Sequence, residues 1–225
     1  MARPAGVRNQ DFEEKRLALI GKMTSYVLKP DIENPSFRQL AIAAEVSEPT
    51  LRHYFTDRSG VIVAIIEHLH TLSESMREST REAAADIPEA LERYHEVVGG
   101  FRRNTLFIRA QAFMIRESMS DPQARKAYID QIIGPSIDAV AERLVKTPGG
   151  PSSYETGCSA GMMLMSASIF MILHQELLDG KTHMPIDEQA YFRQIRFWMQ
   201  NGLKNDPDGS DGQSEDKSED PSKSK

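Results

Sequence analysis

The sequence predicts an all-α protein in which a small N-terminal module of three helices precedes a larger helical bundle. Apolar residues recur at helical spacing along most of the chain, and no segment has the convincing period-2 alternation of a strand. Asp, Asn, Ser, Gly and Pro cluster between the periodic segments, where they cap one helix and stop another. The first helices are short, and those after Arg58 are long.

Composition excludes several classes of protein. The 225 residues are 40% hydrophobic and 27% charged, which is typical of a globular chain and not of a fibrous or disordered one. The single cysteine, Cys158, excludes an intramolecular disulfide, and no Cys/His cluster can hold zinc. The N-terminus has no apolar run of the kind found in signal peptides, so we expect a cytoplasmic protein.

A membrane partner is not expected. The most apolar segment, 157–173, contains three serines and is shorter than the roughly 20 residues that span a bilayer. We interpret this segment as a buried helix.

About nine helices are expected in chain order. Their ranges are 11–28, 36–44, 48–55, 58–81, 88–103, 105–119, 122–146, 155–179 and 187–204. Proline, glycine or short polar residues separate each pair. Within 122–146, Gly134 and Pro135 predict a kink, because proline removes an internal hydrogen bond.

The helices at 36–44 and 48–55 share a small core. The first has a narrow apolar stripe through Phe37, Leu40 and the alanines that follow. Ser47 is a natural N-cap for the second, and the next residue but one is a proline, which the first turn tolerates. Leu51 and Phe55, four residues apart, face inward. The outward side of the second helix therefore presents short polar groups.

Two short helices joined by a tight turn, with hydrogen-bonding side chains on the second, form the arrangement that enters the major groove of DNA. Arg52 and Arg58 lie where a cation can meet a phosphate, and Ser36 can cap its helix or donate to a phosphate. Arg3 and Arg8 can form a loose N-terminal arm.

The pattern Leu-Ala-x-x-Ala-x-Val-Ser-x-x-Thr-Leu-x-x-Tyr-Phe, followed by a polar turn and Arg58, resembles the helix-turn-helix of the TetR family of bacterial transcriptional regulators. The motif covers about 30 residues, and the plan of nine helices also agrees. The resemblance implies a homodimer that binds a palindromic double-stranded DNA operator, most often as a repressor, and that is released by a small-molecule inducer. It implies no enzyme activity and no cofactor.

The resemblance also assigns DNA contacts by matching position. The residues are Ser36, Arg38, Glu48, Pro49, Thr50, Arg52, His53, Tyr54 and Arg58. Tyr54 can instead be a packing residue, and Glu48 can be only a first-turn helix acid. Glu45 stands where the family commonly has a turn glycine, so we expect its φ not to be forced positive. Arg52 replaces a common tyrosine, and Arg58 replaces a common lysine.

The bundle indicates a ligand class more than an identity. Four methionines crowd the helix at 155–179, and two phenylalanines with two methionines line the helix at 105–119. Methionine fills irregular space, so these residues can form core or an adaptable apolar pocket. We expect a small, largely apolar inducer between these two helices, with ligand-binding candidates Arg109, Phe113, Met114, Met163 and His174. Arg109 is the first candidate anchor for an acidic ligand and His174 the second, although each can be an ordinary structural residue.

The last two long helices can form a four-helix dimer seam. The expected seam residues are Ile169, Leu173, Leu177, Ile195, Trp198, Met199 and Leu203.

We divide the chain into a DNA-binding domain at 1–57, a ligand-binding and dimerisation domain at 58–204, and an acidic tail at 205–225. The tail holds seven Asp or Glu against three Lys and no apolar residue, so we expect it to be disordered. Without the tail, the net charge of −6 falls to −2, and residues 1–60 carry nine Lys or Arg against eight Asp or Glu. The negative net charge of the whole chain therefore does not argue against DNA binding.

Two alternatives stay open. Glu67/His70 and Glu92/His95 are two Glu-x-x-His pairs, half the ligand pattern of a di-metal carboxylate oxidoreductase. Both glutamates fall away from the apolar stripes of their helices, so we predict no metal site. No nucleophile motif or phosphate loop occurs, so we predict no catalysis. The other alternative is a helical ligand-binding or interaction protein without specific DNA recognition.

Overall fold

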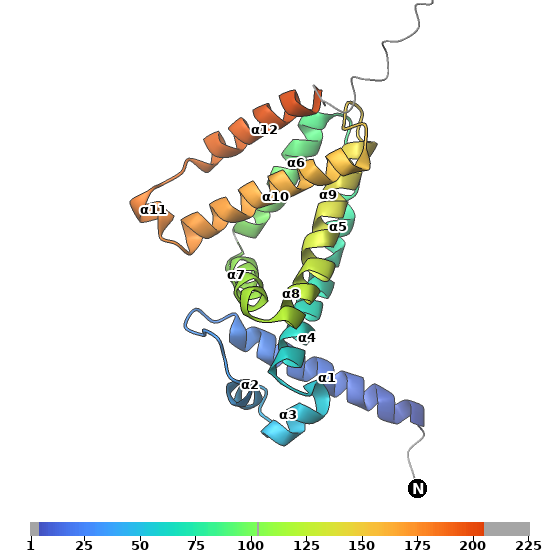
Figure 1. The fold of residues 1–225 in the computed structure, drawn as a ribbon, viewed down its shortest axis with the longest axis vertical. Coiled ribbons are helices and arrows are strands. Elements are labelled where there is room, and N and C mark those ends of the chain that lie inside the picture. Colours follow the sequence, from blue (N-terminus) through green and yellow to red (C-terminus); the bar gives the residue numbers. More distant parts are fainter. Residues whose placement is uncertain (1–4, 103, 205–225) are drawn as a thin grey trace, which may run out of the picture.

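The computed structural model describes residues 5–102 and 104–204, and every regular element in these ranges is a helix. Figure 1 shows an elongated molecule with α1 to α3 at one end and α11 and α12 at the other. The expected all-α architecture is confirmed. The predicted acidic tail at 205–225 and Arg3 lie outside the described residues.

The N-terminal module consists of α1 (Ala5–Val27), α2 (Phe37–Ala43) and α3 (Glu48–Phe55). Ser36 caps α2 in a capping box with Gln39, and Ser47 caps α3 by accepting from the amide of Thr50. The bounds of α3 agree with the prediction residue for residue, because a local serine cap and a first-turn proline fix where it begins.

The turn between α2 and α3 differs from the prediction. Glu45 adopts φ of 59°, so the turn requires the left-handed region although the residue is not glycine. The expectation for its backbone was wrong. The Glu45 carboxylate forms an ion pair with Lys22 of α1, and this hydrogen bond lowers the pKa of Glu45. The ion pair ties the turn to α1.

The expected helix at 58–81 is two helices, α4 (Arg58–Leu72) and α5 (Glu74–Thr80). The hydroxyl of Ser73 donates to the carbonyl oxygens of Leu69 and His70, and accepts from the guanidinium of Arg77. Such side-chain bonds compete with the helical ladder, so the helix is interrupted at this serine.

The middle of the chain forms α6 (Ile87–Arg102), α7 (Thr105–Ser120), α8 (Pro122–Tyr128) and α9 (Gly134–Lys146). A π-helical turn, Ile129–Ile133, joins α8 to α9, and the amide of Gly134 donates to the carbonyl of Ile129, five residues earlier. The irregularity expected at Gly134 and Pro135 therefore takes the form of one wide turn that ends directly before Gly134.

The C-terminal part consists of α10 (Tyr154–Glu176), the short α11 (Gly180–His183) and α12 (Glu188–Lys204). Of the described helices, α10 alone is long and apolar enough to cross a membrane by length and composition, but nearly half of its most apolar window is buried inside the protein. Gly157 and Gly161 let α9 approach so closely that a Cβ at Gly157 would lie 2.9 Å from Val145 Cγ2. Close packing on α9 agrees with the buried-helix interpretation.

Two apolar cores follow each other along the molecule. The first joins α1 to α4 with α7, α8 and the π-helical turn, and the second joins α6, α9, α10 and α12. Phe113 and Met114 of α7 belong to the first core. Packing thus continues across the boundary that we predict at residue 57, and α4 and α7 connect the module to the bundle (Figure 1).

Candidate nucleic-acid interface and ligand cavity

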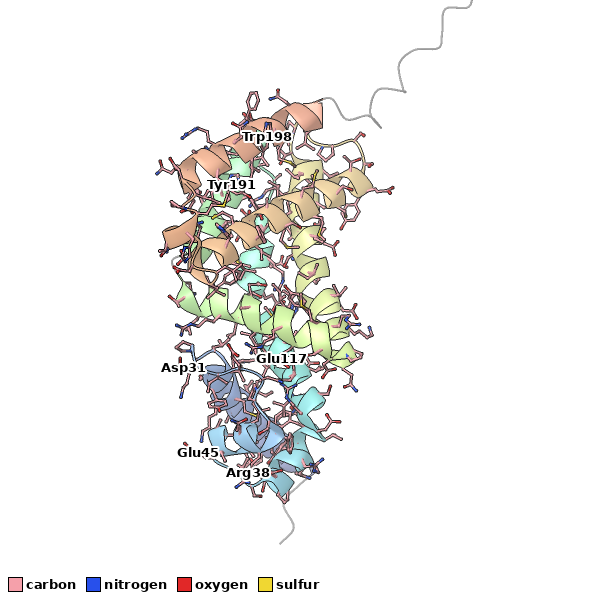
Figure 2. The ribbon with its side chains drawn as sticks, turned by 60° about the vertical axis from the view of Figure 1, so that its left-hand side comes forward. Asp31, Arg38, Glu45, Glu117, Tyr191 and Trp198 are labelled. Carbon is pink, nitrogen blue, oxygen red and sulfur yellow. The ribbon has the colours of Figure 1, made fainter. Side chains whose placement is uncertain are left out.

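The outer face of the N-terminal module presents most of the predicted DNA-contact side chains. Six of the nine are exposed, and Glu48, Tyr54 and Arg58 are half-buried. The exposed residues are Ser36, Arg38, Pro49, Thr50, Arg52 and His53. They come from the start of α2 and from α3. Figure 2 shows Arg38 at the end of the molecule opposite Trp198.

Contacts within the chain fix the side chain of Arg52 in the absence of DNA. Its Nη1 donates to the carbonyl of Thr56 at 3.0 Å, and its guanidinium lies 5.0 Å from the centre of the Phe37 ring. The side chain remains exposed, so the charge can meet a phosphate without a large loss of side-chain freedom.

An aromatic cluster braces α3 against α1. The ring of Tyr54 stacks on Phe12 with centroids 4.7 Å apart, and His53 meets the edge of Phe12 at 5.7 Å. Tyr54 is half-buried, which favours the packing interpretation of this residue. His53 is exposed beside it and keeps ring nitrogens for a partner.

Arg58 differs from the expected phosphate contact. Its Nε donates to the carbonyl of Pro35 at 2.7 Å, and its Nη2 donates to Asn34 Oδ1 at 2.9 Å and to Glu117 Oε2 at 2.8 Å. Glu117 of α7 is fully buried (Figure 2). Because these acceptors occupy the guanidinium, we reassign Arg58 from a phosphate contact to an ion pair that joins α4 to α7.

A cavity of about 740 Å³ lies inside the bundle. Residues of α1, α4, α5, α6, α7, α9 and α10 line it. The apolar side chains of its wall include Leu28, Leu69, Leu72, Met76, Val98, Leu106, Phe107, Met114, Ile132, Val140, Met165, Ile169 and Ile172. The volume and the apolar wall are typical of a small-molecule site.

The cavity lies between the two helices that the sequence analysis selected, α7 and α10, but only Met114 of the five expected ligand residues lines it. Phe113 points into the first core, and Met163 is 58% exposed on the outer face of α10. Arg109 donates to the carbonyl of Leu28, and His174 contacts Gln175 and packs against Gly180. Phe113, Met163, Arg109 and His174 therefore lie outside the wall of this cavity.

The residue that sequence reasoning missed is Arg77 of α5, which lines the cavity and is buried. It follows the buried Ile66 by eleven residues, or three helical turns, so it continues the buried stripe of the preceding helix. The sequence signal that could have identified Arg77 is a positively charged residue at a position of the apolar stripe. The break at Ser73 does not move Arg77 off that face.

Comparison with solved structures identifies the fold. The chain superposes on GusR of Salmonella enterica with a TM-score of 0.62, at 15% identity, over 85% of this chain and 96% of that one. It also matches proteins described as TetR-family transcriptional regulators from Syntrophomonas wolfei, with a TM-score of 0.58 at 13% identity, and from Rhodococcus sp., with a TM-score of 0.56 at 14% identity. These matches cover 85% of this chain and 95% and 99% of those chains respectively. The fold is that of the TetR-family regulators.

The resemblance that the helix-turn-helix motif carries is thus confirmed at the level of the fold. No protein-family model and no curated protein matches the sequence. The TetR-type fold is therefore recognisable in the arrangement of helices although the sequence identities are only 13–15%.

Exposed apolar residues gather on α10 and α12, at the end of this TetR-type fold away from α3 (Figures 1 and 2). The residues are Met162, Met163, Phe170, Leu177, Phe197 and Trp198. Leu177 and Trp198 are two of the residues expected in the dimer seam. Ile195 and Leu203 are instead buried within the chain, and Ile169 lines the cavity, so these three side chains are not part of the exposed apolar face.

The two Glu-x-x-His pairs do not meet in the TetR-type fold. His70 bonds the carbonyl of Gln131 and the guanidinium of Arg77, whereas His95 packs on Phe192 with ring centroids 4.5 Å apart. In residues 5–102 and 104–204, no group of three His, Cys, Asp or Glu can hold a metal ion. Hydrogen bonds therefore account for His70, and ring packing accounts for His95.

His95 makes the stability of the protein sensitive to acid. It is buried without a hydrogen-bond partner among the described groups, and burial lowers its pKa from 6.5 to about 4. Between pH 6.5 and pH 4, His95 is protonated in the unfolded chain but not in the folded chain. The free energy of unfolding therefore decreases as the pH is lowered. We expect this group to account for a loss of about 3 kcal/mol from pH 7 to pH 4.

Urea unfolding of the wild type and of His95→Leu at several pH values measures this effect. The variant should lose less stability than the wild type over the same interval. An identical pH dependence in the two proteins would contradict the assignment to His95.

Proposed function

We propose that the protein is a ligand-responsive DNA-binding transcriptional regulator of the cytoplasm, a repressor that a small, largely apolar inducer releases from a palindromic operator. The exposed polar start of α3 supports the DNA-binding part most strongly. It presents Thr50 and His53 as base-edge contacts, with Glu48 and Pro49 beside them, and Arg52 as a phosphate contact. Ser36 and Arg38 on α2 add phosphate contacts from the neighbouring helix.

The path from inducer to DNA runs through α4. Its C-terminal half contributes His68, Leu69 and Leu72 to the cavity wall, and its N-terminus carries Arg58, which holds the segment before α2. A ligand that binds one position of α4 better than another shifts the spacing of two α3 helices in a dimer. A coupling free energy of about 1 to 3 kcal/mol changes the operator affinity roughly 5- to 150-fold.

Selection of bound sequences from random double-stranded DNA tests this proposal. The expected product is a palindrome, bound with an affinity that falls steeply as the salt concentration rises. Lipophilic acids and neutral compounds that raise the melting temperature are then tested for release of the selected DNA. Selection without any sequence preference would favour the alternative, a helical ligand-binding or interaction protein without specific DNA recognition.

The homodimer in this proposal uses the exposed apolar face of α10 and α12. We expect Phe170→Glu to weaken dimerisation by about 30-fold, because it places a charge where a large aromatic side chain would be buried. Light scattering across a dilution series measures the change. Met119→Glu is the matched control, since Met119 is also a large, exposed apolar residue but lies on α7.

A dimer that tolerates Phe170→Glu as well as Met119→Glu would place the subunit contact elsewhere. A wild type that is monomeric at micromolar concentration would exclude the homodimer itself.

A further inference from the structure

Among the described residues, the wall of the cavity carries one permanent positive charge and no negative one. Of the described residues that line it, Arg77 alone is an arginine or lysine, and none is an aspartate or glutamate. Arg77 is 4% exposed, and burial lowers the pKa of its guanidinium from the ordinary value. A buried charge is costly unless an opposite charge or several hydrogen bonds compensate it.

Hydrogen bonds compensate Arg77 only in part. Its Nη1 donates to Ser73 Oγ, and its Nη2 donates to the carbonyl oxygen of His70 at 2.8 Å and meets His70 Nε2 at 3.3 Å. These bonds use three of the five N–H groups of a guanidinium. No carboxylate lies within ion-pair distance of Arg77 in the part of the chain that the structure describes.

The nearest acids on its own helix do not supply the missing charge. Glu74 and Glu78 are exposed on α5, and Glu78 pairs with Arg81. On the facing helix α9, Glu142 pairs with Arg81 and Lys146. The hydrogen bonds of Arg77 are therefore to neutral groups alone, and Glu74 and Glu78 act on its charge only by Coulombic attraction without an ion pair.

We infer that Arg77 anchors an anionic group of the ligand, so that the cavity takes an amphipathic acid with an apolar body and one carboxylate. The inference rests on the proposed function in that the ligand is the inducer, and it replaces Arg109 as the anchor. Either of the two remaining N–H groups can donate to a carboxylate oxygen, while the apolar wall contacts the rest of the molecule.

Neighbouring groups accept such a ligand. The hydroxyl of Tyr94 donates to Ser168 Oγ at 3.3 Å, and burial raises the pKa of Tyr94 to about 12, so that it stays neutral. Both residues line the cavity, and the hydroxyl hydrogen of Ser168 can be donated to a ligand oxygen. The wall then offers donors to an anion and no repelling charge.

Arg77 also connects the anion to the rest of the fold. His70 accepts from Arg77 through Nε2, so its other ring nitrogen, Nδ1, carries the hydrogen that it donates to the carbonyl of Gln131 in the π-helical turn. A carboxylate that draws the guanidinium toward the cavity changes the bonds at the end of α4.

Matched pairs of ligands test the inference by calorimetric titration of the full chain without DNA. The pairs are dodecanoate with dodecanol, and naphthoate with naphthylmethanol. In at least one pair, the wild type should bind the acid at least tenfold more tightly than the alcohol, since a hydrogen bond to a charged group contributes about 1.5 to 3 kcal/mol. In Arg77→Met the acid should lose that preference, and the alcohol should bind as before.

Arg109→Met is the control, because Arg109 lies outside the cavity wall, and it should keep the preference for the acid. Arg77→Lys, which keeps the charge, should keep part of it. A purely structural role of Arg77 would change the affinities of acid and alcohol together, whereas the inference requires their ratio to change. If Arg77→Met does not fold, the comparison of acid with alcohol in the wild type still decides.

Equal binding of acid and alcohol in the wild type, or a preference that survives Arg77→Met, would overturn the inference and leave the proposed regulator intact. Binding of none of the four compounds would overturn both the anchor and the apolar inducer. Operator selection is a separate measurement, so a failure of DNA binding cannot be mistaken for either result.

Discussion

Arg58→Met is expected to lower the free energy of unfolding by about 3 kcal/mol. The substitution removes the cation that is hydrogen-bonded to the buried carboxylate of Glu117 and leaves only Arg116, whose Nε lies 3.9 Å from Glu117 Oε1. A broken buried ion pair typically costs about 3 to 5 kcal/mol. The lower end applies because the side chain of Arg58 is 27% exposed, which screens part of the interaction. Urea unfolding followed by circular dichroism measures the loss.

The double variant Arg58→Met/Glu117→Leu is the control for this effect. It removes the stranded carboxylate together with its cation, so it should regain at least half of the lost stability. It cannot regain all of it, because the bonds from Arg58 to Pro35 and Asn34 are also gone. A double variant as unstable as the sum of the two single variants would show that the two residues do not interact.

The double variant Thr50→Ala/His53→Ala is expected to lose at least 30-fold in affinity for the selected operator. Each base-edge contact contributes about 1 to 3 kcal/mol of discrimination, and a loss of about 2 kcal/mol corresponds to that factor. Binding to unrelated DNA should stay unchanged, because neither side chain carries a permanent charge. Fluorescence anisotropy with both DNA sequences measures the two affinities.

Two arginine variants complete the experiment. Arg52→Ala should weaken binding to both DNA sequences and lower the salt dependence by about one counterion. Arg193→Ala, at an exposed position of α12 far from α3, should change neither (Figure 1). An operator affinity that is insensitive to Thr50→Ala/His53→Ala would exclude the outer face of α3 as the reading surface.

Local signals predict much of the fold from the sequence. Ser47 and Asp121 cap α3 and α8, and each helix has a proline in its first turn, so these helices begin where expected. The helix-turn-helix motif is local in the same sense, and it led to the correct fold.

Contacts between distant parts of the chain explain what the sequence did not predict. Glu45 adopts a positive φ beside Lys22, 23 residues earlier, and Arg58 turns inward because Glu117 lies 59 residues later. Met163 and Met165 are two residues apart on one apolar helix, yet only Met165 faces the cavity. The methionine content indicated α10 as a wall of the cavity. Only the packing of α10 on α9 decides which of its methionines face the cavity.

The π-helical turn fixes the rotational phase between the two halves of the segment from α8 to α9. α8 packs on α4 and α7, whereas α9 packs on α10, so each half must present its apolar side in a different direction. One residue more than an α-helical turn needs rotates everything beyond it by about 100° about the axis. An uninterrupted α-helix aligned to this segment without a gap would therefore assign every residue of α9 to the wrong neighbour, so the gap in any such alignment belongs at residues 129–133.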